Sequence, residues 1–231
     1  MLDDDVFKKD FNLVVDQLMG FTAATMTVTE ATTTLMHLAV TDPEVLSKLR
    51  SEFQEHILTE GQTDISKATT YENIMDMEYF GCYYKEVLRW MPSAPFTSIY
   101  YFKEDTKIDG IQFKQGDQFS FNIYALQRDP AQWREPEKFV PERFDPKSEW
   151  FKKPNSNEKR HNSSWLPFMG GRRVCAGKTF AEIVPRVMAS HLLHYFDFSP
   201  VDKNAPLPLR VVLKCEPAPA MMKFKLREGV W

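Results

Sequence analysis

The chain has 231 residues, a formal net charge of −3 and a hydrophobic content of 43%. This length allows one large domain or two small ones, and the composition is ordinary for a soluble globular protein. Because Lys and Arg are scattered along a slightly acidic chain, we expect no nucleic-acid partner. Cys82, Cys175 and Cys215 are odd in number and include no C-x-x-C pair, which argues against a disulfide framework and favours reduced thiols.

The first predicted element is one long helix from about Phe11 to Val40, in which apolar residues recur at helical spacing. Its middle part is rich in threonine, a mediocre helix former. Asp42 is a natural N-cap for a second helix, and Pro43 suits the first position of that helix. The segment from 44 to 58 is therefore predicted to be helical, and the sequence GQTD shortly after it predicts a break.

The next predicted elements are a helix and a group of strands. Residues 71 to 92 are predicted to contain a helix that closes at Pro92. The segment from 98 to 129 then alternates apolar and polar residues, with turn signals at Asp109-Gly110 and Gln115-Gly116. This alternation predicts two or three short strands.

The rest of the chain is predicted to be less regular until one further helix. The proline-rich segment from 130 to 150 is expected to be an irregular loop, and the segment from 151 to 164 a polar surface insertion. A helix is predicted to end near His194, and residues 209 to 227 predict a terminal hairpin. The predicted fold class is therefore mainly α with minor β.

The loop around Cys175 is the most unusual stretch of the sequence. Three of the nine glycines, Gly170, Gly171 and Gly177, lie within the same eight residues as this cysteine. Glycine is used where the backbone turns sharply or lets another group approach closely. Two arginines precede the cysteine and a helical segment follows it. The stretch predicts a loop that presents a thiol beside positive charge at a helix start, where a cysteine becomes a thiolate.

Four separated motifs agree with one another. The loop holds F-x-x-G-x-R-x-C-x-G from Phe168 to Gly177, and the helix before Pro92 holds E-x-x-R. The proline-rich segment holds FVPERF from 139 to 144, and the long helix holds AATMTV from 23 to 28. Together, in this order, the motifs resemble the C-terminal half of a cytochrome P450, a heme-thiolate monooxygenase. The resemblance covers essentially the whole chain.

The resemblance implies an architecture. The elements would be a long central helix, the E-x-x-R helix, a small sheet, a meander, the cysteine-ligand loop, a helix and a terminal hairpin. Residues 1–231 would form a single partial domain, without the N-terminal half of the family's fold, its membrane anchor and its substrate-access loops. Such a chain is expected to be a gene-model fragment, the product of a truncated gene, or a domain completed by a separate chain.

The resemblance also implies roles for the loop residues in binding heme b. Cys175 would be the axial iron ligand, and its thiolate would push electron density onto the iron. Arg173 would bind a heme propionate, and Phe168 would pack beside the thiolate and shield it from water. Gly171 and Gly177 would let backbone N–H groups and the following helix approach the cofactor. The alternative is a structural cysteine that follows a glycine turn.

Glu86 and Arg89 lie three residues apart and therefore share one helix face. The resemblance implies that they join Arg143 of the FVPERF motif in a buried ion network that scaffolds the heme-binding core. The alternative is an exposed helical ion pair, which would contribute little to stability.

The AATMTV motif of the long helix occupies the family's oxygen-binding segment. Thr27 lies sixteen residues before Pro43, the spacing of the family's catalytic threonine. The resemblance implies that Ala23 and Ala24 are small residues lining the oxygen groove and that Thr27 organises proton delivery. We expect the Thr27 hydroxyl to bond the carbonyl of Ala23, four residues back. The alternative is that Thr27 is one of many threonines in a buried helix.

The sequence departs from the family in two places near the implied site. Met26 occupies the position of the family's acid and cannot relay a proton, whereas Glu30 could substitute through a water molecule. The segment from 93 to 102 offers no second propionate-binding arginine, so Arg173 is expected to carry more of that work.

The resemblance implies a function for the parent protein. It would insert one oxygen atom of O2 into a small, hydrophobic organic substrate, using two electrons that come from NADPH through a reductase. A heme-thiolate isomerase or dehydratase of a peroxide substrate, and a non-catalytic truncated remnant, remain as alternatives. A eukaryotic parent is expected on the cytosolic face of the endoplasmic reticulum membrane and a bacterial one in the cytoplasm.

Overall fold

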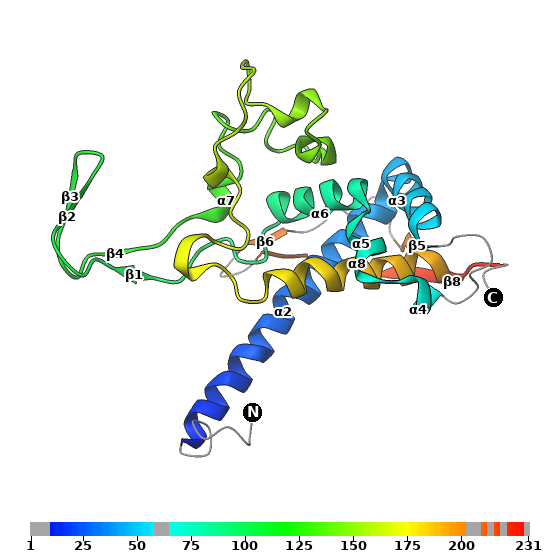
Figure 1. The fold of residues 1–231 in the computed structure, drawn as a ribbon, viewed down its shortest axis with the longest axis horizontal. Helices are drawn as coiled ribbons and strands as arrows, with labels where there is room; N and C mark the ends of the chain where they lie inside the picture. Colours follow the sequence, from blue (N-terminus) through cyan, green and yellow to red (C-terminus); the bar gives the residue numbers. More distant parts are fainter. Residues whose placement is uncertain (1–9, 58–64, 202–208, 212–214, 218–220, 229–231) are drawn as a thin grey trace.

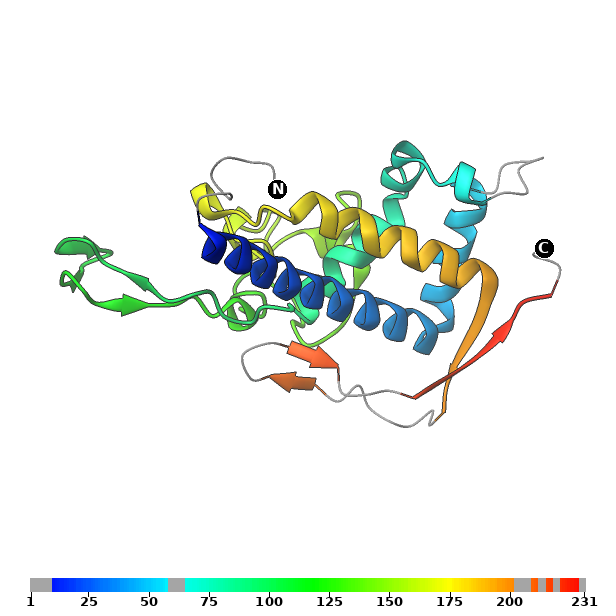
Figure 2. The same ribbon diagram turned by 90° about the horizontal axis from the view of Figure 1, so that it is seen from below.

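The fold is seen in a computed structural model that describes residues 10–57, 65–201, 209–211, 215–217 and 221–228. Helices form its centre, with small two-stranded sheets at the periphery (Figure 1). The long helices α2 (Phe11–Thr41) and α8 (Lys178–Tyr195) pack side by side, as Figure 2 shows. This mixed, mainly helical architecture agrees with the predicted fold class.

Helix α2 confirms the predicted long helix, and its two halves differ in burial. Asp10 caps its start by accepting the N–H of Asn12 at 2.9 Å. In the second half Leu35 and Ala39 are fully buried, whereas the first half projects from the body (Figure 1). Seven large apolar residues of that half are exposed: Phe11, Leu13, Val15, Leu18, Met19, Phe21 and Met26.

Helix α3 (Pro43–His56) starts as the sequence predicts. The Asp42 carboxylate accepts the N–H groups of Glu44 at 3.0 Å and Val45 at 3.2 Å, which satisfies two of the unpaired donors of the helix start. The predicted break at GQTD lies outside the described residues.

The predicted helix between 71 and 92 is two helices, α5 (Tyr71–Met75) and α6 (Glu78–Trp90), preceded by a single turn, α4 (Ile65–Ala68). The division has a physical reason in α3. The Glu52 carboxylate accepts the N–H groups of Tyr79 and Phe80, both at 2.7 Å, so α6 receives its N-terminal cap from another helix. Burial raises the pKa of Glu52.

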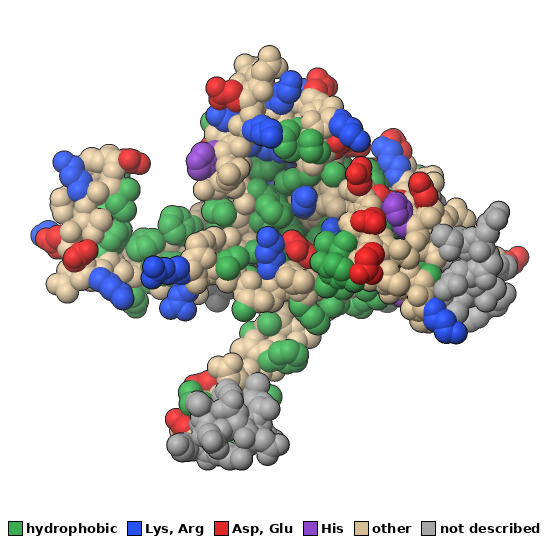
Figure 3. All heavy atoms as spheres, viewed as in Figure 1, with side chains coloured by type: hydrophobic (Ala, Val, Ile, Leu, Met, Phe, Trp, Pro, Cys, Tyr) green, Lys and Arg blue, Asp and Glu red, His purple; other side chains and the backbone are tan. Residues whose placement is uncertain are grey.

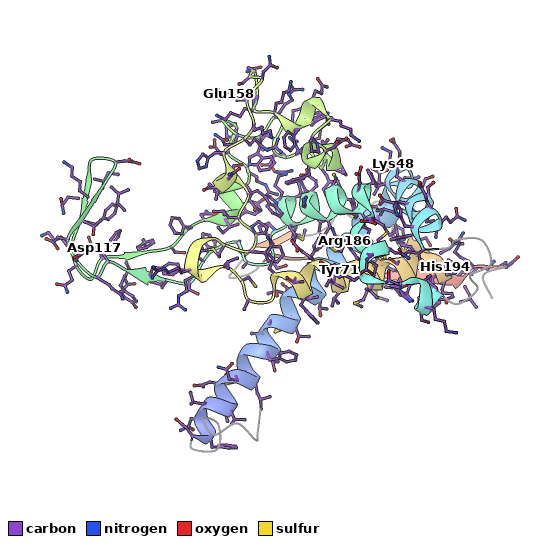
Figure 4. The ribbon with its side chains drawn as sticks, in the orientation of Figure 1. Lys48, Tyr71, Asp117, Glu158, Arg186 and His194 are labelled. Atoms are coloured by element: carbon purple, nitrogen blue, oxygen red, sulfur yellow. The ribbon has the colours of Figure 1, made fainter. Side chains whose placement is uncertain are left out.

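Helix α6 carries the centre of the hydrophobic core. Phe80, Tyr83 and Tyr84 are almost completely buried, and the Tyr83 hydroxyl donates to the Leu35 carbonyl of α2 at 2.6 Å. Arg186 of α8, labelled in Figure 4, lies over the Phe80 and Tyr84 rings, with its guanidinium carbon 5.5 and 5.9 Å from their centroids. These contacts hold α2, α6 and α8 together.

The strand region forms an arm that projects from the body (Figure 1). Strands β1 (Tyr100–Tyr101) and β4 (Gln118–Phe119) pair antiparallel, as do β2 (Thr106–Ile108) and β3 (Ile111–Phe113). Asp109 and Gly110 both have positive φ, 47° and 86°, as the two-residue turn between β2 and β3 requires. There are thus four short strands here, where the sequence predicted two or three.

The prediction of strands up to residue 129 was wrong at its end. Residues Ile123–Leu126 form the short helix α7, because the Asn122 side chain caps it by accepting the N–H of Ala125 at 2.9 Å. A capping Asn followed by only four helical residues gives too little periodicity to be recognised from sequence.

The meander is less irregular than predicted, since it contains the 3₁₀ turns η1 (Pro141–Phe144) and η2 (Glu149–Phe151), with η3 (Asn162–Ser164) after it. The polar insertion is also not purely a surface feature. Arg160 donates to the Trp150 carbonyl at 2.8 Å and to that of Arg143, and stacks 4.3 Å from the centre of the Trp133 ring. Burial lowers the pKa of Arg160 to about 10.

The C-terminal part corrects the predicted hairpin. Strand β6 (Leu209–Val211) pairs with β7 (Cys215–Pro217), but β8 (Met222–Leu226) pairs with β5 (Phe196–Pro200). Strand β5 follows α8 directly and was not predicted. Pairing between strands so far apart in the chain leaves no local sequence signal. None of the helices in the described residues has an apolar stretch long enough to cross a membrane.

Candidate functional site

The first part of the candidate site is a buried ion network between α6 and η1. Arg89 donates to both carboxylate oxygens of Glu86, through Nε at 2.7 Å and Nη2 at 2.8 Å. Arg143 donates to Glu86 Oε1 at 3.3 Å, and the three side chains are 0% exposed. The pair at E-x-x-R is therefore buried and not an exposed helical pair.

Backbone carbonyls satisfy the remaining donors of the two arginines. Arg89 donates to the carbonyls of Gln127 at 3.1 Å and Pro136 at 2.8 Å. Arg143 donates to the carbonyls of Arg134 and Glu135. Burial lowers the pKa of Arg143, while Glu86 opposes this shift. The network thus fixes the meander backbone onto α6 with few unpaired charges.

The second part is the cysteine loop, which leads into α8. The Cys175 N–H donates to the Phe168 carbonyl at 2.9 Å, which closes the loop on itself. Gly171 has a φ of 63°, a conformation that favours glycine, and opens the turn η4 (Gly171–Arg173). Phe168 is half-buried against the core, whereas Cys175 is exposed with a free thiol.

Gly177 lies between the cysteine and α8. A Cβ atom at this position would lie 3.9 Å from Cys175 Sγ, an ordinary contact, so the glycine keeps this side of the sulfur open. Helix α8 begins one residue later, and its N-terminus has the partial positive charge that suits an anion. Val174 and Phe180, which lie before and after Cys175 in the chain, are 48% and 59% exposed, so this segment presents apolar surface.

A cavity of about 720 Å³ borders the loop. One wall is formed by residues of the segment from 94 to 103, and the other by Leu166, Pro167, Met169 and Arg173. The ion network supports this wall, because Gln127 accepts the N–H of Leu166 at 3.1 Å while its own carbonyl accepts Arg89. Cavities of this size hold small organic ligands and cofactors.

The AATMTV segment lies on the exposed half of α2, and one expected contact there was wrong. The Thr27 hydroxyl donates to the carbonyl of Ala24 at 2.8 Å, and not to that of Ala23. In a helix a threonine hydroxyl reaches the carbonyl three or four residues back according to its rotamer, and here it takes the nearer one. Ala23, Ala24 and Thr27 are all exposed.

A further contact ties Thr27 to the cavity side of the molecule. The Ser93 hydroxyl donates to the Thr27 carbonyl at 3.1 Å, and the chain continues from Ser93 into the wall segment that starts at Ala94. Among the described residues, no hydrogen bond joins Thr27 to the cysteine loop. Sequence reasoning missed Ser93, because only the fold brings it beside α2.

The residue types around the loop and cavity suit heme. A thiol is a soft ligand for iron, an arginine suits a carboxylate, and the surrounding surface is largely apolar. Cys175 and Arg173 belong to the same loop, so both functions are available within a few residues.

Known proteins are similar to this chain over most of its length. The family model described as Cytochrome P450 matches residues 8–224. The rice (Oryza sativa subsp. japonica) 9-beta-pimara-7,15-diene oxidase is 31% identical over 187 residues, which cover 80% of this chain and 35% of that protein. Cytochrome P450 4A10 of Rattus norvegicus is 31% identical over 212 residues, 91% of this chain and 38% of that protein.

A third relative, cytochrome P450 3A11 of Mus musculus, is 27% identical over 202 residues. These residues cover 87% of this chain and 37% of the mouse protein. The chain thus spans little more than a third of the length of the curated relatives that it matches.

Proposed function

The chain belongs to the cytochrome P450 family, whose members are heme-iron monooxygenases, and we propose that residues 1–231 are the heme-binding C-terminal half of such an enzyme. They form one partial domain, with α2 as the family's central helix. The observation that carries this proposal is the loop itself, where an exposed Cys175 follows Arg173 beside a cavity of about 720 Å³.

Each residue of the loop has a proposed task. Cys175 would hold the heme iron through its thiolate, Arg173 would bind a heme carboxylate, and Phe168 would pack beside the sulfur. Gly171 and Gly177 keep the backbone close to the cofactor. Heme bound through a thiolate supplies the redox chemistry with dioxygen.

The other residues support the loop or move protons. Glu86, Arg89 and Arg143 form the scaffold that holds the meander and, through Gln127, the loop wall. Thr27 of α2 organises proton delivery, with Ala23 and Ala24 beside it as small residues of the oxygen groove. The parent enzyme takes two electrons from a reductase that draws on NADPH and oxidises a small, hydrophobic organic substrate.

One observation favours a second function for the parent, an isomerase or dehydratase that acts on a peroxide substrate. Met26 stands before Thr27, is exposed and cannot relay a proton, and such a reaction needs no proton-delivering acid. Turnover that depends on NADPH and a reductase supports the monooxygenase, whereas turnover of a hydroperoxide without them supports the alternative.

The test of heme binding is the reduced, carbon-monoxide-bound difference spectrum of the full chain with added heme. Wild-type protein is expected to give the strongly red-shifted Soret band of thiolate ligation, and Cys175→Ser is expected to lose it. Cys82→Ser is the matched control, since this thiol is half-buried on α6 and burial raises its pKa to about 11. Absence of the band in wild-type protein would contradict the proposal and favour a non-catalytic remnant.

A further inference from the structure

Two cations from different segments of the chain line the cavity beside the cysteine loop. Arg173 comes from the loop, and Lys103 comes from the end of the wall segment that leads into the arm. Among the described residues, no hydrogen bond or ion pair is formed by either side chain, although most other arginines of the fold are paired. Figure 3 shows Lys and Arg side chains where the arm meets the body, beside hydrophobic side chains.

Two acidic residues, Glu104 and Asp105, follow Lys103 in the chain, and within the described residues neither forms an ion pair with it. The Asp105 carboxylate accepts the N–H of Gln115 at 2.8 Å, which fixes it to the other side of the arm. Lys103 is exposed and free to point toward an anion in the cavity.

The wall that carries Lys103 is fixed to the body at its base. The N–H of Ile123 donates to the Pro95 carbonyl at 2.8 Å, and the N–H of Thr97 donates to the Phe121 carbonyl at 3.0 Å. Phe96 and Asn122 form a further bridge between the same two segments. The cavity therefore has a largely apolar lining, with one cation from the wall segment and one from the cysteine loop.

This combination suits a flat, apolar ligand that has carboxylates at its edge. Heme b has two such carboxylates, and the sequence offers no arginine between 93 and 102 for the second one. We propose that Lys103 is a second carboxylate-binding residue of the heme site and shares this task with Arg173. The inference rests on the proposed function, because it takes heme as the ligand of the cavity.

The experiment compares two probes, hemin and hemin dimethyl ester, which lacks the free carboxylates. Their dissociation constants are measured by Soret titration of the full chain and of the variant Lys103→Gln. The variant is expected to bind hemin about three- to fivefold more weakly, the effect of losing one partly exposed ion pair. It is expected to bind the dimethyl ester as wild-type protein does, and the hemin effect is expected to shrink at high salt.

Two further variants make the result specific. Lys107→Gln removes an exposed lysine of β2 that does not line the cavity, and it is expected to change neither dissociation constant. Lys103→Arg is expected to restore hemin affinity. Equal weakening for hemin and its ester, no weakening for hemin, or the same loss in Lys107→Gln would overturn the role of Lys103.

The two proposals can fail separately. If the carboxylate-dependent loss is seen but the thiolate band is absent, the Lys103 contact stands and Cys175 ligation is wrong. If the thiolate band is present but Lys103→Gln binds hemin normally, heme ligation stands and the Lys103 inference is wrong.

Discussion

The ion network of α6 and the cysteine loop both contain arginines, but they differ in whether these arginines are buried and ion-paired. Glu86, Arg89 and Arg143 are fully buried, and carbonyls of the meander satisfy the donors that Glu86 leaves over. Arg173 and Cys175 are exposed and form no ion pair within the described residues. The comparison teaches that the charges of the network are satisfied among the described residues, whereas the loop leaves its cation and its thiol accessible.

The comparison is tested most strongly by removing the charge at the centre of the network. Glu86→Gln leaves two buried guanidinium groups without a counter-charge, so the free energy of unfolding is expected to fall by about 3–5 kcal/mol. Urea denaturation followed by circular dichroism measures this fall. Glu44→Gln breaks the exposed pair with Lys48 and is expected to cost under about 1 kcal/mol. Similar losses for both variants would contradict the larger contribution of the buried network to the free energy of unfolding.

A smaller loss is expected from the cap that α3 provides for α6. Glu52→Ala leaves the N–H groups of Tyr79 and Phe80 without an acceptor, which is expected to cost about 1–2 kcal/mol in the same assay. Glu55→Ala, an exposed change on the same helix, is the control. If the two variants unfold alike, the start of α6 does not depend on α3.

The buried half of α2 adds a pH dependence to stability through His37. Burial lowers the pKa of His37 from its usual 6.5, so the unfolded chain takes up this proton first as the pH falls. The contribution of neutral His37 to the free energy of unfolding is therefore fully present above about pH 6.5, and it is lost progressively as the pH falls below that value. His37→Gln is expected to flatten this decrease between pH 7.5 and 5.5. An unchanged slope in His37→Gln would contradict the effect of burial.

The smallest effect on stability is expected at the loop. Cys175→Ser replaces an exposed side chain, so the free energy of unfolding is expected to change by less than about 0.5 kcal/mol. The same variant is expected to abolish the thiolate spectrum. A loss of 2 kcal/mol or more, on the order of a buried contact, would show that the thiol is part of the packing and would remove the contrast between the two regions.

The elements that the sequence predicted well are those with local signals. Helix α2 and the Asp42 cap follow from apolar spacing and from one capping side chain next to Pro43. Other features join residues far apart in the chain, namely the cap that Glu52 gives to α6 and the pairing of β5 with β8. No local sequence pattern predicts them. The contacts of Arg160 could not be predicted from its polar segment for the same reason, because its partners lie in the meander.

The candidate site shows the same division. The spacing of Glu86 and Arg89 places them on one helix face, and the structure brings Arg143 to them through the meander. The acceptor of the Thr27 hydroxyl depended on a rotamer, which spacing does not determine. The cavity between Lys103 and Arg173 depends on how the arm meets the loop, and only the tertiary structure places these walls together.

Pro185 in α8 has a mechanical consequence. A proline has no N–H, so the carbonyl of Ala181, four residues before it, lacks its usual helical partner. The Tyr84 hydroxyl of α6 donates to this carbonyl at 2.7 Å. Ala181 lies in the first turn after the cysteine loop, so this hydrogen bond ties α6 to the start of α8. A displacement of α6 would therefore be passed directly to the end of the loop that holds Cys175.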